Sequence, residues 1–309
     1  MKFENLKGIN VLWLSKTGLT NLNSGEGEAN LVDIKRYKMM NEEFPYVSGQ
    51  AMRYYFKEAI RRNLRSEEEM CRPNKLGETC GEIGNCIGCD LFGFMITVKK
   101  KGAVTRVSPV KVSPAMGLLQ FEENSVLDFL TRRKPQKAVE ERIGDIVNVE
   151  IGTNIYKCGV AIDVMKVGCE ELWTKDGYKL KPLVSTKEKV NRISKVVEAL
   201  RFITDYSKQA RLLTDFTPDI ICVAFQNKYS HRLQKLLELD EGCTLNESRV
   251  KQILDDVKDY TDELKFGIIS GIIDKEDAVK EIFESYKIPV STPAEVINSS
   301  IKELAELEI

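Results

Sequence analysis

Histidine is almost absent from this sequence, because His231 is the single histidine among 309 residues. Metal centres built from several histidines, and phosphodiesterase mechanisms that use a pair of them, are therefore excluded. A Ser-His-Asp triad would have to use His231, which lies in the segment KYSHRLQKLLEL. That segment has the pattern of a surface helix, which argues against a positioned general base.

Other familiar signals are also missing. The chain has no apolar run of about 18 residues, which is the length that a membrane-spanning helix needs. Its first residues, MKFENLKGIN, lack the apolar centre of a secretory signal. We therefore expect a cytoplasmic protein with reduced cysteines, since disulfides are rare in that compartment. Neither GxGxxG nor GxxxxGK[ST] occurs, so no nucleotide-binding loop is indicated.

Charge is nearly balanced overall but unevenly distributed. The formal net charge is −1, and residues 240–309 hold 17 acids and 8 bases, a net of −9. The rest of the chain therefore carries +8, by subtraction of −9 from −1. Because electrostatic fields are local and screened within about 10 Å, such a chain can still hold a basic groove.

Four of the eight cysteines lie within the window CRPNKLGETCGEIGNCIGC, as Cys71, Cys80, Cys86 and Cys89. The spacing C-x8-C-x5-C-x2-C closes on a CxxC pair, which supplies two soft ligands from one tight turn. The glycines of the window provide the open dihedral angles that a loop folded around an ion needs. We expect a structural zinc site. Unligated thiols and an iron–sulfur cluster are the alternatives, because both zinc and iron accept four cysteines.

A basic helix is expected directly before the cysteine window. Ser48 is a plausible N-cap for a helix from Gly49 to Asn63, with one apolar stripe and a second stripe of Arg53, Lys57 and Arg61. Only Glu58 offsets the positive charge between residues 53 and 65. Such a stripe is commonly just a solvated face, but here it also suits the phosphates of a nucleic acid. Residues 96–137 add nine bases against three acids.

The remaining pattern predicts an α+β protein. We expect buried or alternating strands at 9–15, 90–98, 103–113, 154–168 and 215–225, and helices at 186–207, 230–259 and 274–286. A last helix is expected after Thr292, where Pro293 and Glu295 indicate a capping box. The order of these elements fits a βαββαβ ferredoxin-like core with large insertions better than a doubly wound sheet.

Three segments carry a resemblance to a known family. FPYVSGQAMRYYFKEAI, CDLFGFM and KQARLLTDFTPD resemble motifs of CRISPR backbone subunits of the RAMP superfamily, and most of all the DevR autoregulator-type branch of type I systems. Together the motifs span roughly residues 9–225. The resemblance implies a single hand-shaped domain over residues 1–309, with a modified RRM-like palm. Cysteine-rich fingers would occupy 64–90, a thumb hairpin 120–153, and an acidic helical part 227–309.

The resemblance also implies a function. The chain would be a non-catalytic subunit that binds guide RNA (crRNA) and polymerises along it in a type I Cascade complex for antiviral defence. Its partners would be crRNA, the target DNA strand, copies of itself and other Cascade subunits, with no membrane. The resemblance and the charge pattern together give these candidate RNA-binding residues: Ser48, Gly49, Gln50, Arg53, Lys57, Arg61, Arg132, Arg133, Lys134, Lys208, Gln209 and Arg211.

Two other functions remain open from the sequence. Related type III backbones cleave target RNA with an aspartate in the loop before the SGQ-like segment, and Asp33 stands in a comparable place. The second alternative is a zinc-stapled protein-interaction module that uses the acidic C-terminal helices. A DNA-binding repressor is less favoured, because no helix-turn-helix pattern is present.

Overall fold

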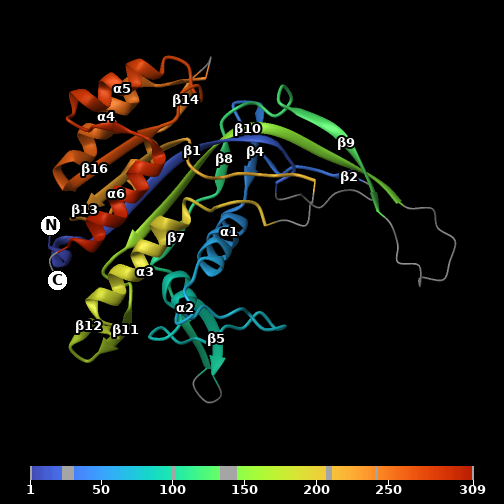
Figure 1. Ribbon diagram of the computed structural model, residues 1–309. Coiled ribbons are helices and arrows are strands. Elements are labelled where there is room, and N and C mark those ends of the chain that lie inside the picture. Colours follow the sequence, from blue (N-terminus) through green and yellow to red (C-terminus); the bar gives the residue numbers. More distant parts are fainter. Residues whose placement is uncertain are drawn as a thin grey trace, which may run out of the picture.

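The computed structural model describes residues 2–22, 31–98, 102–132, 145–206, 211–240 and 243–307. These residues form an α+β fold around one large mixed sheet with the strand order β17-β16-β13-β1-β10-β8-β4-β3 (Figure 1). The strands of this sheet are β1 (Gly8–Thr20), β2 (Leu31–Val32), β3 (Arg36–Met39), β4 (Glu42–Val47), β7 (Val110–Val112), β8 (Ala115–Gly117), β9 (Ser125–Arg132), β10 (Asp145–Asp163), β13 (Ile220–Gln226), β16 (Thr261–Ile268) and β17 (Val290–Ser291).

The remaining strands form small two-stranded sheets: β5 (Phe94–Val98) with β6 (Gly102–Arg106), β11 (Cys169–Thr174) with β12 (Gly177–Pro182), and β14 (Leu239–Asp240) with β15 (Thr244–Leu245). The helices are α1 (Gly49–Arg62), α2 (Ile87–Phe92), α3 (Thr186–Ala199), α4 (Glu247–Val257), α5 (Glu276–Ser285) and α6 (Pro293–Ala305). Short 3-10 turns occur at Phe3–Asn5, Arg232–Lys235 and Lys258–Tyr260. No helix in the described ranges has the length and apolarity needed to cross a membrane.

The centre of the sheet confirms the ferredoxin-like core. β1 pairs antiparallel with β10 on one side and with β13 on the other, and β10 pairs antiparallel with β7 and β8. With α1 after β1 and α3 after β10, this is the βαββαβ arrangement that the sequence predicts. β1 is buried on both faces, since Val11 and Trp13 belong to the core under α1 and α3 while Leu12 and Leu14 belong to the core under α4 and α5.

Several expected elements differ in the structure. The predicted strand DLFGFMITV begins as helix α2, because Cys86 caps a helical turn and Gly93, at φ +66°, ends it before β5. Helix α3 ends at Ala199 rather than near residue 207. In place of the helix predicted over 230–259, the described residues form a 3-10 turn, a small hairpin, α4 and the start of a second 3-10 turn. The hairpin β11–β12 and strand β16 were not predicted.

A buried carboxylate joins the cysteine window to the rest of the fold. Asp90 is fully buried and accepts hydrogen bonds from the guanidinium groups of Arg106 and Arg192 and from the backbone N–H of Gly168 at 2.9 and 3.0 Å. Arg192 also donates to the carbonyl oxygens of Ile83 and Gly84, at 2.7 and 2.5 Å. The Asp90 clamp, defined as Asp90, Arg106 and Arg192, therefore fixes α2 against β6 and α3.

Removal of the central carboxylate should destabilise the protein strongly. Asp90→Ala leaves two buried guanidinium groups without their shared partner, which costs about 3–5 kcal/mol of unfolding free energy. Urea unfolding followed by circular dichroism measures the loss. The matched control is Asp176→Ala in the β11–β12 turn, where the side chain is 80% exposed and the expected change is under about 0.5 kcal/mol. Equal unfolding midpoints for the two variants would contradict a structural role for the clamp.

Candidate nucleic-acid interface and metal site

Helix α1 presents one apolar face and one basic face. Ser48 is the N-cap, as predicted, and its hydroxyl accepts a hydrogen bond from the backbone N–H of Ala51 at 3.3 Å. One face buries Met52, Phe56 and Ala59 in the core. Because residues four apart share a helix face, the basic residues at 53, 57 and 61 line up on another side.

The basic face of α1 borders two adjoining hollows. One, of about 510 Å³, lies between α1 and the cysteine window, and the other, of about 570 Å³, lies between the start of α1 and β7. Both are lined by Gln50 and Arg53, so the two hollows adjoin along α1. We call the two together the α1 groove, and its polar and charged side chains include Gln50, Arg53, Lys57, Glu58, Arg61, Arg72, Ser108 and Lys111.

Cations outnumber acids in the α1 groove. Five of the groove's side chains are basic and one, Glu58, is acidic, and Glu58 pairs with Arg61 and lies 3.9 Å from Arg72. Within the described ranges, Arg53 and Lys57 form no ion pair and instead lie over the ring of Phe92, at 5.7 and 5.5 Å from its centroid. The groove thus holds positive charge that its own acids leave uncompensated.

The electrostatics of these cations reflect burial and mutual repulsion. Burial lowers the pKa of Arg53. The pKa of Lys57 is lowered first by burial and then by the charges of Arg53 and Arg61. The pKa of Arg61 is likewise lowered by burial and by Arg72. A bound anion would relieve this repulsion, so the groove is chemically suited to phosphate groups.

The structure brings part of the predicted RNA-binding set together. Gly49, Gln50, Arg53, Lys57 and Arg61 all line the α1 groove. Ser48 caps the start of α1, next to these residues. Arg211 contacts the β9–β10 ribbon, the side chain of Arg132 is not described, and Arg133, Lys134, Lys208 and Gln209 lie outside the described residues.

Two groove cations were missed by the sequence reasoning. Arg72 reaches the groove because it follows Cys71 in the folded loop, and Lys111 because β7 runs beside the start of α1. The sequence held a partial signal for Lys111, which lies in the basic stretch 96–137. It held none for Arg72, whose position depends on how the cysteine loop folds.

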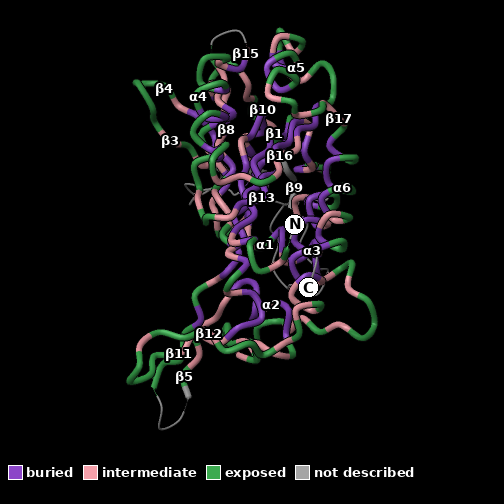
Figure 2. Tube along the Cα trace, turned by 90° about the vertical axis from the view of Figure 1, so that its left-hand side faces the viewer, coloured by how far each residue is buried: buried purple, intermediate pink, exposed green. Residues whose placement is uncertain are grey.

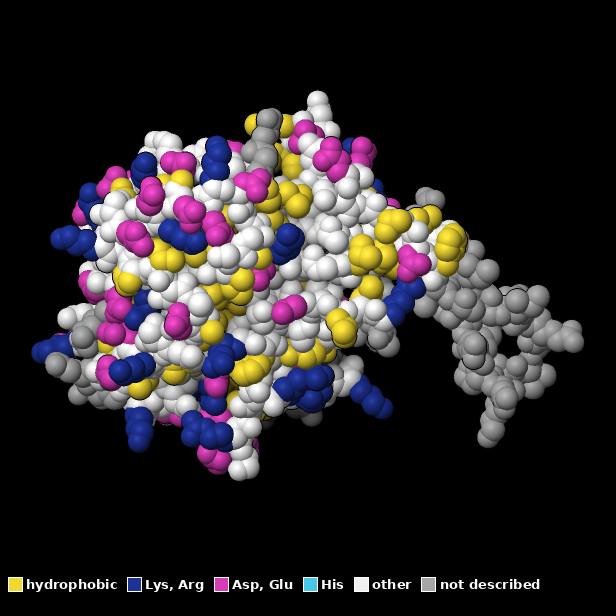
Figure 3. Space-filling view, turned by 45° about the horizontal axis from the view of Figure 1, so that its top comes forward, with side chains coloured by type: hydrophobic (Ala, Val, Ile, Leu, Met, Phe, Trp, Pro, Cys, Tyr) yellow, Lys and Arg dark blue, Asp and Glu magenta, His cyan; other side chains and the backbone are white. Residues whose placement is uncertain are grey.

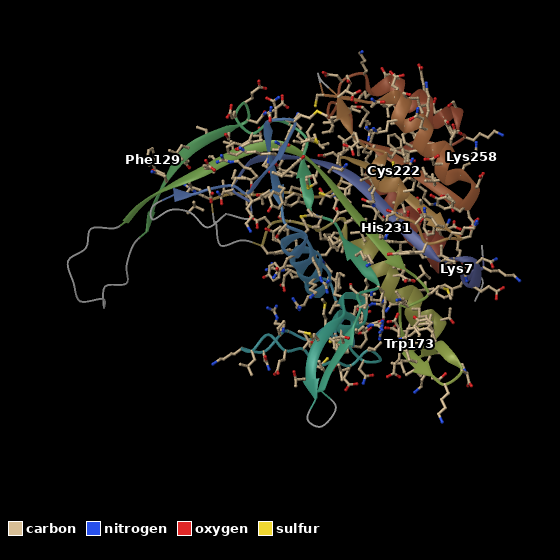
Figure 4. The ribbon with its side chains drawn as sticks, turned by 180° about the vertical axis from the view of Figure 1, so that it is seen from behind. Lys7, Phe129, Trp173, Cys222, His231 and Lys258 are labelled. Atoms are coloured by element: carbon tan, nitrogen blue, oxygen red, sulfur yellow. The ribbon has the colours of Figure 1, made fainter. Side chains whose placement is uncertain are left out.

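The projecting ribbon carries apolar side chains on its surface. β9 and the first half of β10 form a long hairpin that leaves the body of the molecule, within the segment predicted as the thumb (Figure 1). Val126, Leu127 and Phe129 are exposed there, and apolar groups gather on the ribbon in Figure 3. Figure 4 shows Phe129 far out on this ribbon. Arg211 forms an ion pair with Asp128 at 2.9 Å and donates to the carbonyl oxygen of Phe129 at 2.8 Å.

The four clustered cysteines converge on one point beside the α1 groove. Their sulfur atoms all lie within 4.8 Å of one another. The sulfur of Cys89 is 3.7 Å from that of Cys71 and 3.6 Å from that of Cys80. A tetrahedral tetrathiolate with metal–sulfur bonds of about 2.3 Å has sulfur–sulfur edges of about 3.8 Å, so the observed geometry fits a metal ion.

The surroundings of Cys86 favour its thiolate form. Its sulfur accepts hydrogen bonds from the backbone N–H groups of Cys71 and Cys89, both at 3.4 Å. The neighbouring Cys89 thiol and these N–H groups lower the pKa of Cys86 to about 4. N–H donors that converge on a thiolate hold it in place as a ligand. The residues at this point could therefore hold a metal ion, as the spacing predicted.

Asp33 and His231 lie apart from one another. Asp33 lies between β2 and β3, and its Oδ1 atom is shielded from solvent and makes no hydrogen bond to any described group. His231 is exposed beside a 3-10 turn and forms a hydrogen bond to the hydroxyl of Tyr229 at 2.9 Å. Burial lowers the pKa of His231.

Comparison with solved structures gives the fold an independent match. A chain from a structure titled "CRISPR RNA-guided surveillance complex" aligns with a TM-score of 0.56 and 12% identity, over 96% of this chain and 99% of that one. A second, from "CRISPR RNA-guided surveillance complex, pre-nicking", aligns with a TM-score of 0.59 and 10% identity over the same shares. At these identities the likeness concerns the fold.

Comparison with curated proteins found no match. A sequence profile for the family described as "CRISPR-associated negative auto-regulator DevR/Csa2" matches residues 17–231. This range contains α1, the cysteine window, the LFG segment and the predicted motif near Arg211. The chain therefore belongs to the CRISPR-associated DevR/Csa2 family.

Proposed function

We propose that this protein is a non-catalytic subunit that binds crRNA and oligomerises along it in a type I CRISPR surveillance (Cascade) complex. The observation that carries the proposal is the α1 groove, where five basic side chains face one acid. Family membership and the similarity of fold to chains of surveillance complexes support the same function. The target DNA strand, further copies of this chain and other Cascade subunits are the partners that this role requires.

The groove is chemically suited to the RNA backbone rather than to bases. Its donors are guanidinium and ammonium groups, together with the side-chain amide of Gln50, and these bind phosphate oxygens. Such contacts carry no sequence information, which suits a subunit that must accept many guides. The exposed apolar side chains of the β9–β10 ribbon would contact the RNA or the next subunit outside the groove.

Loss of one groove cation should weaken RNA binding in a salt-dependent way. For Arg53→Ala or Lys57→Ala, the slope of log K against log salt should fall by about 0.7 for each lost phosphate contact on single-stranded RNA. At 0.1 M salt this corresponds to about fivefold weaker binding, because 10 to the power 0.7 is about 5. Fluorescence anisotropy of a labelled oligouridine over a salt series measures both quantities.

Lys258→Ala is the matched control for this experiment. Lys258 is exposed, pairs with Asp255 and lies on the far side of the molecule from α1 (Figure 4). This variant should bind RNA as the wild type does. An oligouridine affinity that is the same for all variants, or that is insensitive to salt, would contradict the proposed interface.

We propose further that the cysteine cluster holds a structural zinc ion. Among the described residues, the group of candidate metal ligands at this point consists of four cysteines, and four thiolates suit a closed structural zinc site. The loop from Arg65 to Asn85 contains no helix or strand, and most of its residues are exposed (Figure 2). A segment with so small an apolar core gains its fixed structure from a metal.

Elemental analysis of the native protein tests the metal. We expect about one zinc per chain in the wild type, and loss of zinc in Cys80→Ser because one of four ligands is removed. Cys243→Ser is the control, since Cys243 lies outside the cluster and should leave the zinc content unchanged. Iron with sulfide, or no metal at all, would contradict a zinc site.

The proposal that the chain does not cut RNA is tested at Asp33. The alternative ribonuclease would use Asp33, so Asp33→Ala would abolish cleavage if it occurred. We expect no cleavage of complementary target RNA by the assembled wild type in Mg²⁺, and an identical result for Asp33→Ala. Gel analysis of labelled target RNA makes the comparison. Cleavage by the wild type that Asp33→Ala abolishes would instead establish a ribonuclease.

A further inference from the structure

The loop that carries the cysteines also forms a wall of the α1 groove. The hollow of about 510 Å³ is lined on one side by Arg53, Lys57 and Arg61 of α1, and on the other by Cys71, Arg72, Pro73, Thr79 and Cys89. Two of the four candidate metal ligands therefore face the same space as the cations of α1. The candidate metal site and the proposed RNA-binding groove therefore share a wall.

Direct contacts place Arg72 beside the basic stripe. The Arg61 guanidinium donates a hydrogen bond to the carbonyl oxygen of Cys71 at 3.2 Å. Arg72 follows Cys71, and its guanidinium lies 3.9 Å from Glu58 of α1 with 72% of its side chain exposed. Arg72 is thus close enough to share an acid with Arg61 and open enough to reach a ligand.

The position of Arg72 depends on the cysteine cluster. Residues 64–86 contain no helix or strand, so regular backbone hydrogen bonding does not hold Arg72 where it is. The flanking Cys71 is held through its sulfur, near that of Cys89, and through its N–H, which donates to Cys86. A metal ion bound by these sulfur atoms would fix Cys71 and, with it, the neighbouring arginine.

The placement of Arg72 and the net charge of the groove predict opposite effects of metal loss on RNA binding. The groove holds five basic side chains and Glu58, a net of +4. A divalent ion with four thiolates adds −2, which leaves +2, whereas the metal-free cluster with Cys86 alone as a thiolate adds −1, which leaves +3. If charge alone governed RNA binding, loss of the metal would strengthen it. If the placement of Arg72 governed it, loss of the metal would weaken it.

We propose that the metal-bound cysteine loop delivers Arg72 as a phosphate-binding residue, so that the loop completes the RNA groove and binding of the RNA backbone depends on the metal. This inference rests on the proposed function, because it assigns a further contact and a metal requirement to the same groove. Arg72 would hold the phosphate that lies between α1 and the loop. The ligand class is a phosphodiester chain with no base preference.

The test compares Arg72 variants of the full chain, with and without metal, on labelled oligouridine. Arg72→Ala should lower the salt slope by about 0.7, with about fivefold weaker binding at 0.1 M salt. Arg72→Lys, which keeps the charge, should retain the wild-type slope. The control is Lys75→Ala, an exposed cation of the same loop that does not line the groove, and it should bind as the wild type does.

The second part of the test combines removal of the metal with Arg72→Ala. Wild-type protein stripped of metal by a chelator should show the same reduced slope as metal-bound Arg72→Ala, and stripping Arg72→Ala should cause no further loss, because the two changes remove one contact. An unchanged far-UV circular dichroism spectrum is the check that the stripped protein keeps its secondary structure. A slope that becomes steeper on stripping, or that Arg72→Ala leaves unchanged, would overturn the inference.

The outcomes separate this inference from the proposed function. If Arg53→Ala weakens RNA binding while Arg72→Ala and metal removal do not, the α1 groove binds RNA and only the role of the loop is wrong. If the metal-bound wild type does not bind oligouridine in a salt-dependent manner, the proposed function itself fails and the inference fails with it.

Discussion

The buried carboxylate of Asp90 is the interaction on which the candidate site depends. It is shared by Arg106 and Arg192, and it lies in α2, between the CxxC pair and Phe92. A desolvated charge with two guanidinium partners has few alternative arrangements, because any other leaves a buried ion unpaired. The clamp therefore fixes both the cysteine cluster on one side and, on the other, the ring that lies beneath Arg53 and Lys57.

The parts of the fold that the sequence predicted are those specified by local interactions. α1 has an N-cap, an apolar stripe and no competing signal, and the structure begins it at the predicted residue. β13 is a continuous apolar run, buried along its full length. By contrast, β16 begins with TDEL, whose charges resemble a helix surface, and it is a strand because β13 offers an unpaired edge. Tertiary pairing decided that element, so local pattern could not.

The residues of the candidate site also divide into those that the local sequence predicts and those that depend on tertiary contacts. Four cysteines at close spacing predict their own convergence, because the ligands are near in sequence and a metal site needs them together. The stripe at 53, 57 and 61 is visible because helical spacing places it on one face. The contribution of Arg72 and Lys111 is not visible, since each reaches the groove only when a loop or strand folds against α1. The position of the Phe92 ring beneath Arg53 and Lys57 was not visible either, because Phe92 is the last residue of α2 and not part of the predicted strand.

The proposed binding of a polyanion requires a balance of charge in the α1 groove. Burial of a cation is costly, and it is the first cause of the lowered pKa values of Lys57 and Arg61. Glu58 and a metal-thiolate cluster would each offset part of it while lying to one side of the path of the ligand. This partial compensation leaves only a weak attraction for a single small anion. For one chain with many phosphates, the attractions at successive phosphates add together. Such a groove would favour a long RNA strand over free phosphate, which is the selectivity that the proposed filament along a guide requires.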